Sequence, residues 1–172
     1  LKKGGNVIIT GQDDLGEFDF DEAFVVDIKN LVLILKAVSN FGDGELLAKV
    51  LHIDFLKIPP LDTYKLLDAS RRVSLYDLIR SKKRMQDIGV SKAVRLNKLY
   101  YKLLSWNEFS KSKSVPQTFE RIVRESGFLE HTLKKEDYIE GVSRARTIHQ
   151  LSRRLASSAS DYKLFDFLEN LD

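Results

Sequence analysis

The amino-acid sequence repeats one pattern along most of its length: apolar residues recur every three or four positions, and short breaks separate the blocks. This spacing places the apolar side chains on one face of an α-helix. The 172 residues include only three prolines and nine glycines, too few for a fold with many tight β-turns. The sequence therefore predicts a mainly α protein, folded as a multi-helix orthogonal bundle with one short N-terminal strand.

Local start and stop signals delimit the expected helices. Asp43 and Ser91 stand where helix N-caps are expected, and Ser74 with Asp77 has the spacing of a capping box. Gly127 follows a periodic apolar block and is placed to end a helix, because glycine readily adopts the left-handed conformation. A basic loop is expected at 82–84 and a turn at 128–133. The expected helices span 21–39, 45–53, 61–71, 75–83, 91–110, 119–127, 136–155 and 162–171.

The first 20 residues have a different pattern. The run at 7–10 is β-branched and bounded by glycines, which predicts one strand, and 12–20 is predicted to be an acidic loop. A single strand leaves its backbone edge unpaired, so a partner strand is expected outside this chain. The chain starts at Leu1 and holds no complete active site. We therefore expect an excised piece of a larger protein, with 1–20 leading in from a neighbouring domain and 21–172 forming a single helical accessory domain.

Positive charge is concentrated in the middle of the chain. The formal net charge is +3, but residues 71–113 alone hold 12 basic and 3 acidic side chains. Lys92, Arg95, Lys98 and Lys102 follow one another at intervals of three, three and four, so they form one stripe on the helix expected at 91–110. Such a cluster favours a polyanionic partner. The ordinary alternative is a solvated helix face without a ligand.

No residue pattern indicates a catalytic, cofactor or metal site. The chain has no cysteine, and His52, His131 and His149 lie far apart without metal-ligand spacing. A phosphate-binding loop of the Gly-x-x-x-x-Gly-Lys type is absent. Trp106 lies in an apolar stretch and is expected in the core rather than as a platform for nucleic-acid bases. No apolar run reaches the ~20 residues that span a membrane and no signal peptide is recognised, which is consistent with a cytoplasmic protein.

Several stretches match the motifs of one protein family in the same order. The run 7–11 leads into the helical segment 24–35, and 46–51 follows with the rhythm of an x-Leu-Leu-x-x-Leu-Leu helix. Residues 119–129 are similar to x-x-Ile-x-Glu-x-Ser/Thr-Gly-Tyr/Phe-Leu, and 162–171 to the ending Ser-Leu-x-x-Phe-Leu. The chain thus resembles the accessory domain called 2B, which is inserted in the second RecA-like motor domain of UvrD/Rep-type superfamily 1 DNA helicases.

This resemblance implies a mostly helical domain that swivels relative to the motor, contacts duplex DNA or partner proteins, and regulates unwinding. The ATP site and its Mg²⁺ belong to the motor domains of the suspected parent, so the resemblance implies no catalytic residue, cofactor or metal in this chain. Many members present a Gly-Ile-Gly loop to the duplex backbone. Here the corresponding residues are Lys57, Ile58, Pro59 and Pro60, and proline supplies no N–H donor for a phosphate.

Two functions of different classes follow. The first is weak, non-specific DNA binding by a helicase accessory domain, with the remaining motor domains and a further protein as partners. The alternative is a helical protein-interaction module that binds no nucleic acid and has an exposed apolar groove lined by Phe165, Phe167 and Trp106. A sequence-specific DNA binder is disfavoured, because no short turn leads into a helix with base-reading side chains. For the first function, phosphate contacts are expected from Lys57, Lys82, Lys83, Arg84, Lys92, Arg95, Lys98 and Lys102.

Overall fold

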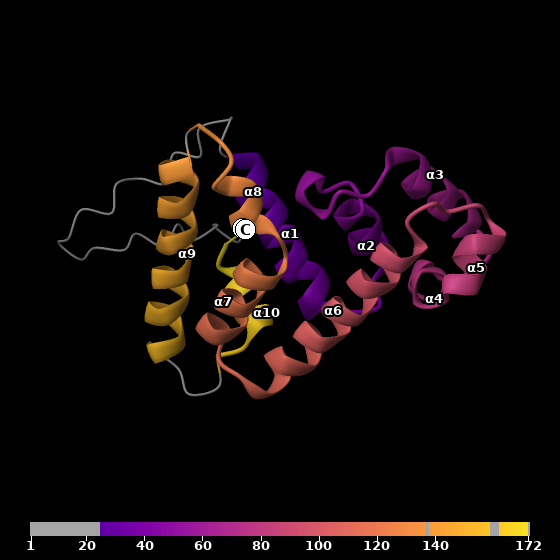
Figure 1. Cartoon of the computed structure of the whole chain (residues 1–172). Helices are drawn as coiled ribbons and strands as arrows, with labels where there is room; N and C mark the ends of the chain where they lie inside the picture. The colour runs from indigo at the N-terminus through magenta and orange to yellow at the C-terminus, as the bar shows by residue number, and fades with distance from the viewer. Residues whose placement is uncertain (1–24, 137, 159–161, 172) are drawn as a thin grey trace, which may run out of the picture.

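The computed structural model describes residues 25–136, 138–158 and 162–171 (Figure 1). These residues fold into ten α-helices and one 3-10 helix and contain no β-strand, which confirms the mainly α prediction. The predicted strand at 7–10 and the acidic loop at 12–20 lie outside the described residues. The elements are α1 (Val25–Ser39), α2 (Gly44–Val50), η1 (Asp54–Leu56), α3 (Pro60–Ala69), α4 (Leu75–Arg80), α5 (Lys82–Asp87), α6 (Ala93–Ser112), α7 (Val115–Glu125), α8 (Phe128–Thr132), α9 (Tyr138–Ser158) and α10 (Leu164–Glu169).

Helices α1 and α6 form the centre of the fold. In Figure 1, α2 to α5 lie towards one end of the molecule and α7 to α10 towards the other. Helix α1 packs against α2, α6, α9 and α10, whereas α6 also packs against α4, α5 and α7. Leu31, Ile34 and Leu35 of α1 and Leu96 and Leu103 of α6 have no exposed surface. One apolar core therefore runs along both helices and joins the two ends.

Asparagine side chains of α6 bind carbonyl groups at the C-termini of two other helices. The last carbonyls of an α-helix have no partner within the helix. Asn97 Nδ2 donates to the carbonyl of Arg80 at 2.7 Å, at the end of α4. Asn107 Nδ2 donates to the carbonyl of Val38 at 2.8 Å, near the end of α1. Because both asparagines are buried, these bonds fix the position of α6 relative to α1 and α4.

The N-terminus of α6 is capped from α3 and not by its own sequence. The Asp62 carboxylate, which is 1% exposed, accepts hydrogen bonds from the N–H groups of Ser91 and Lys92, both at 2.8 Å. It also accepts one from the Ser91 hydroxyl at 2.9 Å. The N-cap residue is Lys92, whose side chain makes no capping bond. The prediction that Ser91 caps this helix is therefore wrong, since a carboxylate is the stronger acceptor at a helix N-terminus.

The helix expected at 75–83 is interrupted before Ser81. The Ser81 side chain accepts a hydrogen bond from the N–H of Arg84 at 3.3 Å and begins the separate helix α5. Residues 82–84 consequently lie in the first turn of a helix, so the prediction of a basic loop is wrong. Neither proline nor glycine marks the break. The end of α4 is instead bound by Asn97, a partner that the local sequence does not show.

The segment after Gly127 and two apolar side chains also differ from expectation. Gly127 has a φ of 95°, which suits its predicted role as a helix stop, but the turn expected at 128–133 contains the short helix α8. The three- and four-residue spacing of apolar positions includes Val94 and Ile139, yet these side chains are 54% and 70% exposed. Val94 lies four residues before the exposed Lys98 and therefore on the solvent side of α6.

Helix α9 approaches α8 closely at Gly141. A Cβ atom at this position would lie 2.6 Å from Cγ2 of Thr132, a side chain that is 1% exposed. Replacing a helical glycine by alanine ordinarily stabilises a helix by about 1 kcal/mol. Here we expect Gly141→Ala to lower the free energy of unfolding by about 1–2 kcal/mol, because the stiff, buried threonine cannot move aside. Urea unfolding followed by circular dichroism measures this change.

Removing the methyl group of Thr132 provides the control for this prediction. In a Thr132→Ser background, Gly141→Ala should leave the free energy of unfolding nearly unchanged or should raise it, since serine lacks the Cγ2 atom that the new Cβ would meet. An unfolding free energy for Gly141→Ala at or above that of the wild type would contradict the close packing of α8 and α9.

Candidate nucleic-acid interface

The solvent side of α6 carries a row of basic side chains. Arg95 and Lys98 are exposed within the helix, and Lys92 is exposed at its N-cap. The opposite side of α6 packs in the core through Leu96 and Leu103. Because residues three or four apart share one face of a helix, the basic side chains lie on the same side. Lys92, Arg95 and Lys98 are called here the cationic face of α6.

The first turn of α5, residues 82–84, adds three exposed cations. Helix α5 contacts α6, and the end of α4 just before it is bound by Asn97 of α6. This turn contains no acidic residue, and a helix N-terminus itself carries a partial positive charge. The first turn of α5 and the cationic face of α6 thus lie on two helices that contact each other, and they are called here the charged region of α5 and α6.

Lys57 is linked to the cationic face through its backbone. Arg95 Nη1 donates to the carbonyl of Lys57 at 2.9 Å, and the left-handed φ of 54° at Lys57 turns the chain from η1 towards α3. Lys57 Nζ lies 3.7 Å from Oε1 of Glu130. The hydrogen bond from Lys134, together with the charges of Lys134 and Lys57, lowers the pKa of the Glu130 carboxyl. Glu130 is thus ionised at neutral pH, and its charge weakens the attraction of Lys57 for a phosphate.

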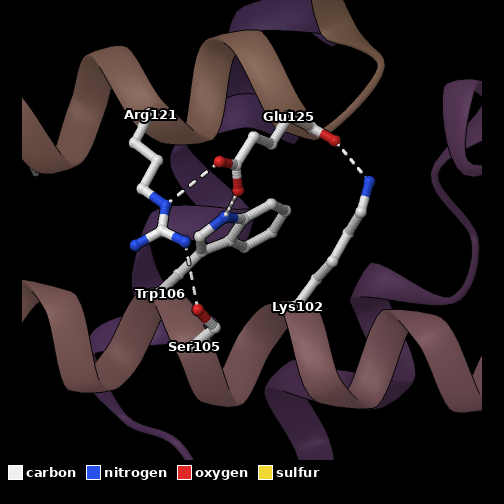
Figure 2. A network of polar contacts seen from close by, with 5 residues as sticks. All are labelled: Lys102, Ser105, Trp106, Arg121 and Glu125. Atoms are coloured by element: carbon white, nitrogen blue, oxygen red, sulfur yellow. Dashed lines mark hydrogen bonds and ion pairs between the residues drawn. The ribbon is translucent and has the colours of Figure 1, made fainter.

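Lys102 makes a packing contact with α7. Its Nζ donates to the carbonyl of Glu125 at 2.5 Å, at the C-terminus of that helix (Figure 2). A cation is favourable there because the terminal carbonyls carry partial negative charge. A phosphate at Lys102 would compete with this contact. The structure therefore gives Lys102 a role in joining α6 to α7, unlike Lys98.

Trp106 belongs to a polar network between α6 and α7, which Figure 2 shows. Its ring is 1% exposed, which confirms the prediction that it lies in the core, and Nε1 donates to Oε2 of Glu125 at 2.7 Å. Oε1 of the same carboxylate accepts from Arg121 Nε at 3.1 Å, and Arg121 Nη2 donates to the Ser105 hydroxyl at 3.1 Å. The guanidinium also lies 4.6 Å from the centre of the Phe109 ring. The network holds α6, and with it the cationic face, against α7.

One exposed aromatic residue on α6 was not singled out from the sequence. Tyr101 is 54% exposed and follows Lys98 by three residues, so the two side chains share one side of the helix. The adjacent Tyr100 is 9% exposed, although both tyrosines lie in the same apolar stretch. The apolar spacing separates the two tyrosines, since Tyr100 follows Leu96 by four residues and precedes Leu103 by three, whereas Tyr101 follows Lys98 by three.

An apolar groove of about 730 Å³ lies between α1, α9 and α10. The groove predicted for a protein-interaction module has a different lining. Trp106 and Phe167 are 1% and 0% exposed, and Phe165, although 52% exposed, does not line the groove. That lining was therefore predicted wrongly, because Trp106 and Phe167 are needed in the core. The residues that line the groove are Ile28, Lys29, Asn30, Val32, Leu33, Lys36, Ile148, Leu151, Asn170 and Leu171.

The histidines lie in separate places and make different contacts. His131 Nε2 is 3.4 Å from Oδ1 of Asp27, whereas the His149 ring stacks on Phe119 with centroids 5.9 Å apart. Within the described ranges, no three histidine, aspartate or glutamate side chains are grouped as a metal site requires. None of the described helices combines the length and the apolar character needed to cross a lipid bilayer.

Comparison with models of protein families finds no match to this chain. A search among curated proteins finds no match either. The function of this chain is therefore inferred from the geometry of the charged region and from the resemblance of the sequence motifs.

Proposed function

We propose that this chain is a helical accessory domain of a UvrD/Rep-type ATP-dependent DNA helicase, which makes weak, non-specific contacts with DNA phosphates during unwinding and repair. The observation that carries the proposal is the positively charged region formed by the cationic face of α6 and the first turn of α5. The proposal includes an orthogonal bundle with the strand at 7–10, and a cytoplasmic location. It also includes motor domains of the parent chain as partners, with ATP and Mg²⁺ bound there.

Phosphate binding is the function that suits these side chains best. Lys82, Lys83, Arg84 and Lys98 are exposed on α5 and α6. When lysine and arginine side chains bind the phosphates of a duplex or a single strand, they displace counterions condensed on the DNA. The release of these counterions drives binding and does not depend on the nucleotide sequence. Affinities of this kind are typically about 10⁻⁴ to 10⁻⁶ M at physiological salt. Weak binding is appropriate for a domain that moves along DNA with its motor.

Lys57 and Lys102 are expected to contribute less than the other cations. Lys57 lies beside the ionised Glu130, and Lys102 is engaged with the end of α7. The loop at Lys57 is the place where the resembled family presents backbone donors to duplex DNA. In this chain the main DNA contact is therefore proposed on α5 and α6 and not on that loop.

A double charge reversal tests the proposal. We expect Lys83→Glu/Lys98→Glu to weaken binding of a fluorescent DNA oligonucleotide at low salt by about tenfold or more, since two attractive charges become repulsive. Fluorescence anisotropy measures the dissociation constant. Neither side chain takes part in the packing contacts of α6 described above, so the fold should be unchanged.

Arg153→Glu/Arg154→Glu is the matched control for this test. Both arginines are exposed on α9, and the change in net charge is the same. The control should retain most of the affinity. Equal losses in the two double variants would show that net charge, and not the proposed region, determines binding, and would reject the proposal.

The groove between α1, α9 and α10 supports the second function, a helical protein-interaction module without nucleic-acid binding. An apolar groove of this size is suited to bury a partner's side chains. The same titration separates the two functions. A wild-type chain that does not bind DNA at low salt would reject the first function and leave the second.

A further inference from the structure

We infer that Tyr101 stacks on an unpaired DNA base, so that the charged region of α5 and α6 binds single-stranded DNA in preference to duplex. This inference rests on the proposed function, because the phosphate contacts come from the same region. Tyr101 lies three residues after Lys98 and six after Arg95 on the solvent side of α6. At 3.6 residues per turn, Arg95 points about 120° away from the tyrosine, whereas Lys98 lies one turn before it on the same side of the helix. One strand can therefore contact Lys98 and the ring together.

The Tyr101 ring is supported by a buried aromatic cluster. Its centroid lies 5.1 Å from that of Tyr100, with the two rings nearly perpendicular at 89°. Tyr100 in turn packs edge-on against Tyr76 at 6.4 Å and against Phe41 at 5.8 Å. Neighbours that already hold a side chain in place reduce the entropy it loses on binding. Tyr101 therefore presents its exposed side to solvent in a restricted orientation, as a stacking platform requires.

An aromatic ring beside cations distinguishes single strands from duplex DNA. In a duplex the faces of the bases are covered by their neighbours, whereas an unpaired base can leave the stack and contact Tyr101. Stacking of a base on an aromatic side chain contributes about 1–3 kcal/mol and depends little on the base. An acidic peptide would satisfy Arg95 and Lys98, but it offers no π face to the ring. The combination of charges and ring thus favours a single strand.

Anisotropy titrations with three probes test this inference. The probes are an oligothymidine of about 20 nucleotides, an abasic strand of the same length, and a duplex of the same length. We expect the wild type to bind oligothymidine about tenfold more tightly than the abasic strand. Tyr101→Ala should lose about tenfold in affinity for oligothymidine and nothing for the abasic strand, which has the phosphates but no base. Tyr101→Phe should bind like the wild type, because the ring is kept.

Tyr138→Ala is the matched control, since Tyr138 is 43% exposed on α9, away from the cations of α5 and α6. It should leave the affinity for all three probes unchanged. Unaltered oligothymidine binding in Tyr101→Ala would overturn the inference, as would a wild-type affinity for the abasic strand or for the duplex equal to that for oligothymidine. If Lys83→Glu/Lys98→Glu still abolished DNA binding, the proposed function would stand while the stacking inference failed. If neither the charge reversal nor Tyr101→Ala reduced binding, both would fail.

Discussion

Replacing Asp62 by alanine is expected to lower the free energy of unfolding by about 3 kcal/mol. The carboxylate is 1% exposed and accepts three hydrogen bonds from Ser91 and Lys92 at the N-terminus of α6. Alanine would leave two backbone N–H groups without their acceptor and would remove the negative charge from the positive end of a 20-residue helix. Urea unfolding followed by circular dichroism measures the loss.

Asp68→Ala is the control for the Asp62 variant. Asp68 is on the same helix, but its side chain is exposed and makes only a solvated ion pair, in which Oδ1 lies 3.7 Å from Nε of Arg71. We expect a change below about 0.5 kcal/mol. A loss of similar size in both variants would show that the cap on α6 contributes nothing specific.

The contribution of Asp62 should also depend on pH. Burial by itself raises the pKa of the Asp62 carboxyl, but the hydrogen bonds from Ser91 and Lys92 outweigh burial and lower the pKa below its usual value. An unfolded aspartate has a pKa of about 3.9. Because the folded pKa is the lower one, the carboxylate stabilises the fold above about pH 3.9, and this stabilisation is lost as the pH falls through the folded pKa.

The advantage of the wild type over Asp62→Asn should therefore be greatest near neutral pH. Asparagine has nearly the same shape, but it carries no charge and its Nδ2 cannot accept the bonds from Ser91 or Lys92. We expect the difference in unfolding free energy to narrow below about pH 3.9. A difference that stays constant from about pH 6 to about pH 3 would contradict an ionised cap.

Replacing Trp106 by alanine is expected to cost about 4 kcal/mol of the free energy of unfolding. The indole is the largest fully buried side chain, and it fills the space between α6 and α7. Its Nε1 also donates to Glu125, so the variant loses a hydrogen bond as well as apolar burial. Trp106 is the only tryptophan in the chain, so circular dichroism and not intrinsic tryptophan fluorescence must follow unfolding.

A double-mutant cycle separates the hydrogen bond from the packing of the indole. Glu125→Ala should cost about 2 kcal/mol in the wild-type background, since the buried Nε1–H is left without an acceptor. In Trp106→Phe, which has no such donor, the same change should cost about 1 kcal/mol less. Strictly additive losses would show that the bond between Trp106 and Glu125 adds no stability.

The sequence predicts a helix boundary correctly where the residues that determine the boundary are close together in the chain. Asp43 was predicted to cap the second helix, and its carboxylate accepts from the N–H groups of Glu45 and Leu46 at 2.8 and 3.1 Å. Gly127 was predicted to stop a helix, and it has the positive φ of that role. In both cases the residue type and its immediate neighbours fix the backbone.

The sequence was insufficient where the partner is distant along the chain. Asp62 lies 29 residues before Ser91, so nothing near α6 indicates its true cap. Lys102 has the spacing of a DNA-binding cation, yet its ammonium group donates a hydrogen bond to the carbonyl of Glu125 at the end of α7. Tyr101 is exposed, but the edge-on contact of its ring with Tyr100, and of Tyr100 with Tyr76, is not apparent from the sequence. Such assignments require the three-dimensional arrangement of the helices.

The salt dependence of DNA binding tests the central claim, that the charged region of α5 and α6 contacts phosphates. For oligothymidine, the logarithm of the wild-type association constant should fall linearly with the logarithm of the salt concentration. In Lys98→Gln, which removes one cation, the slope should be smaller in magnitude by about 0.7. An affinity that does not change with salt, or a Lys98→Gln slope equal to that of the wild type, would contradict the claim.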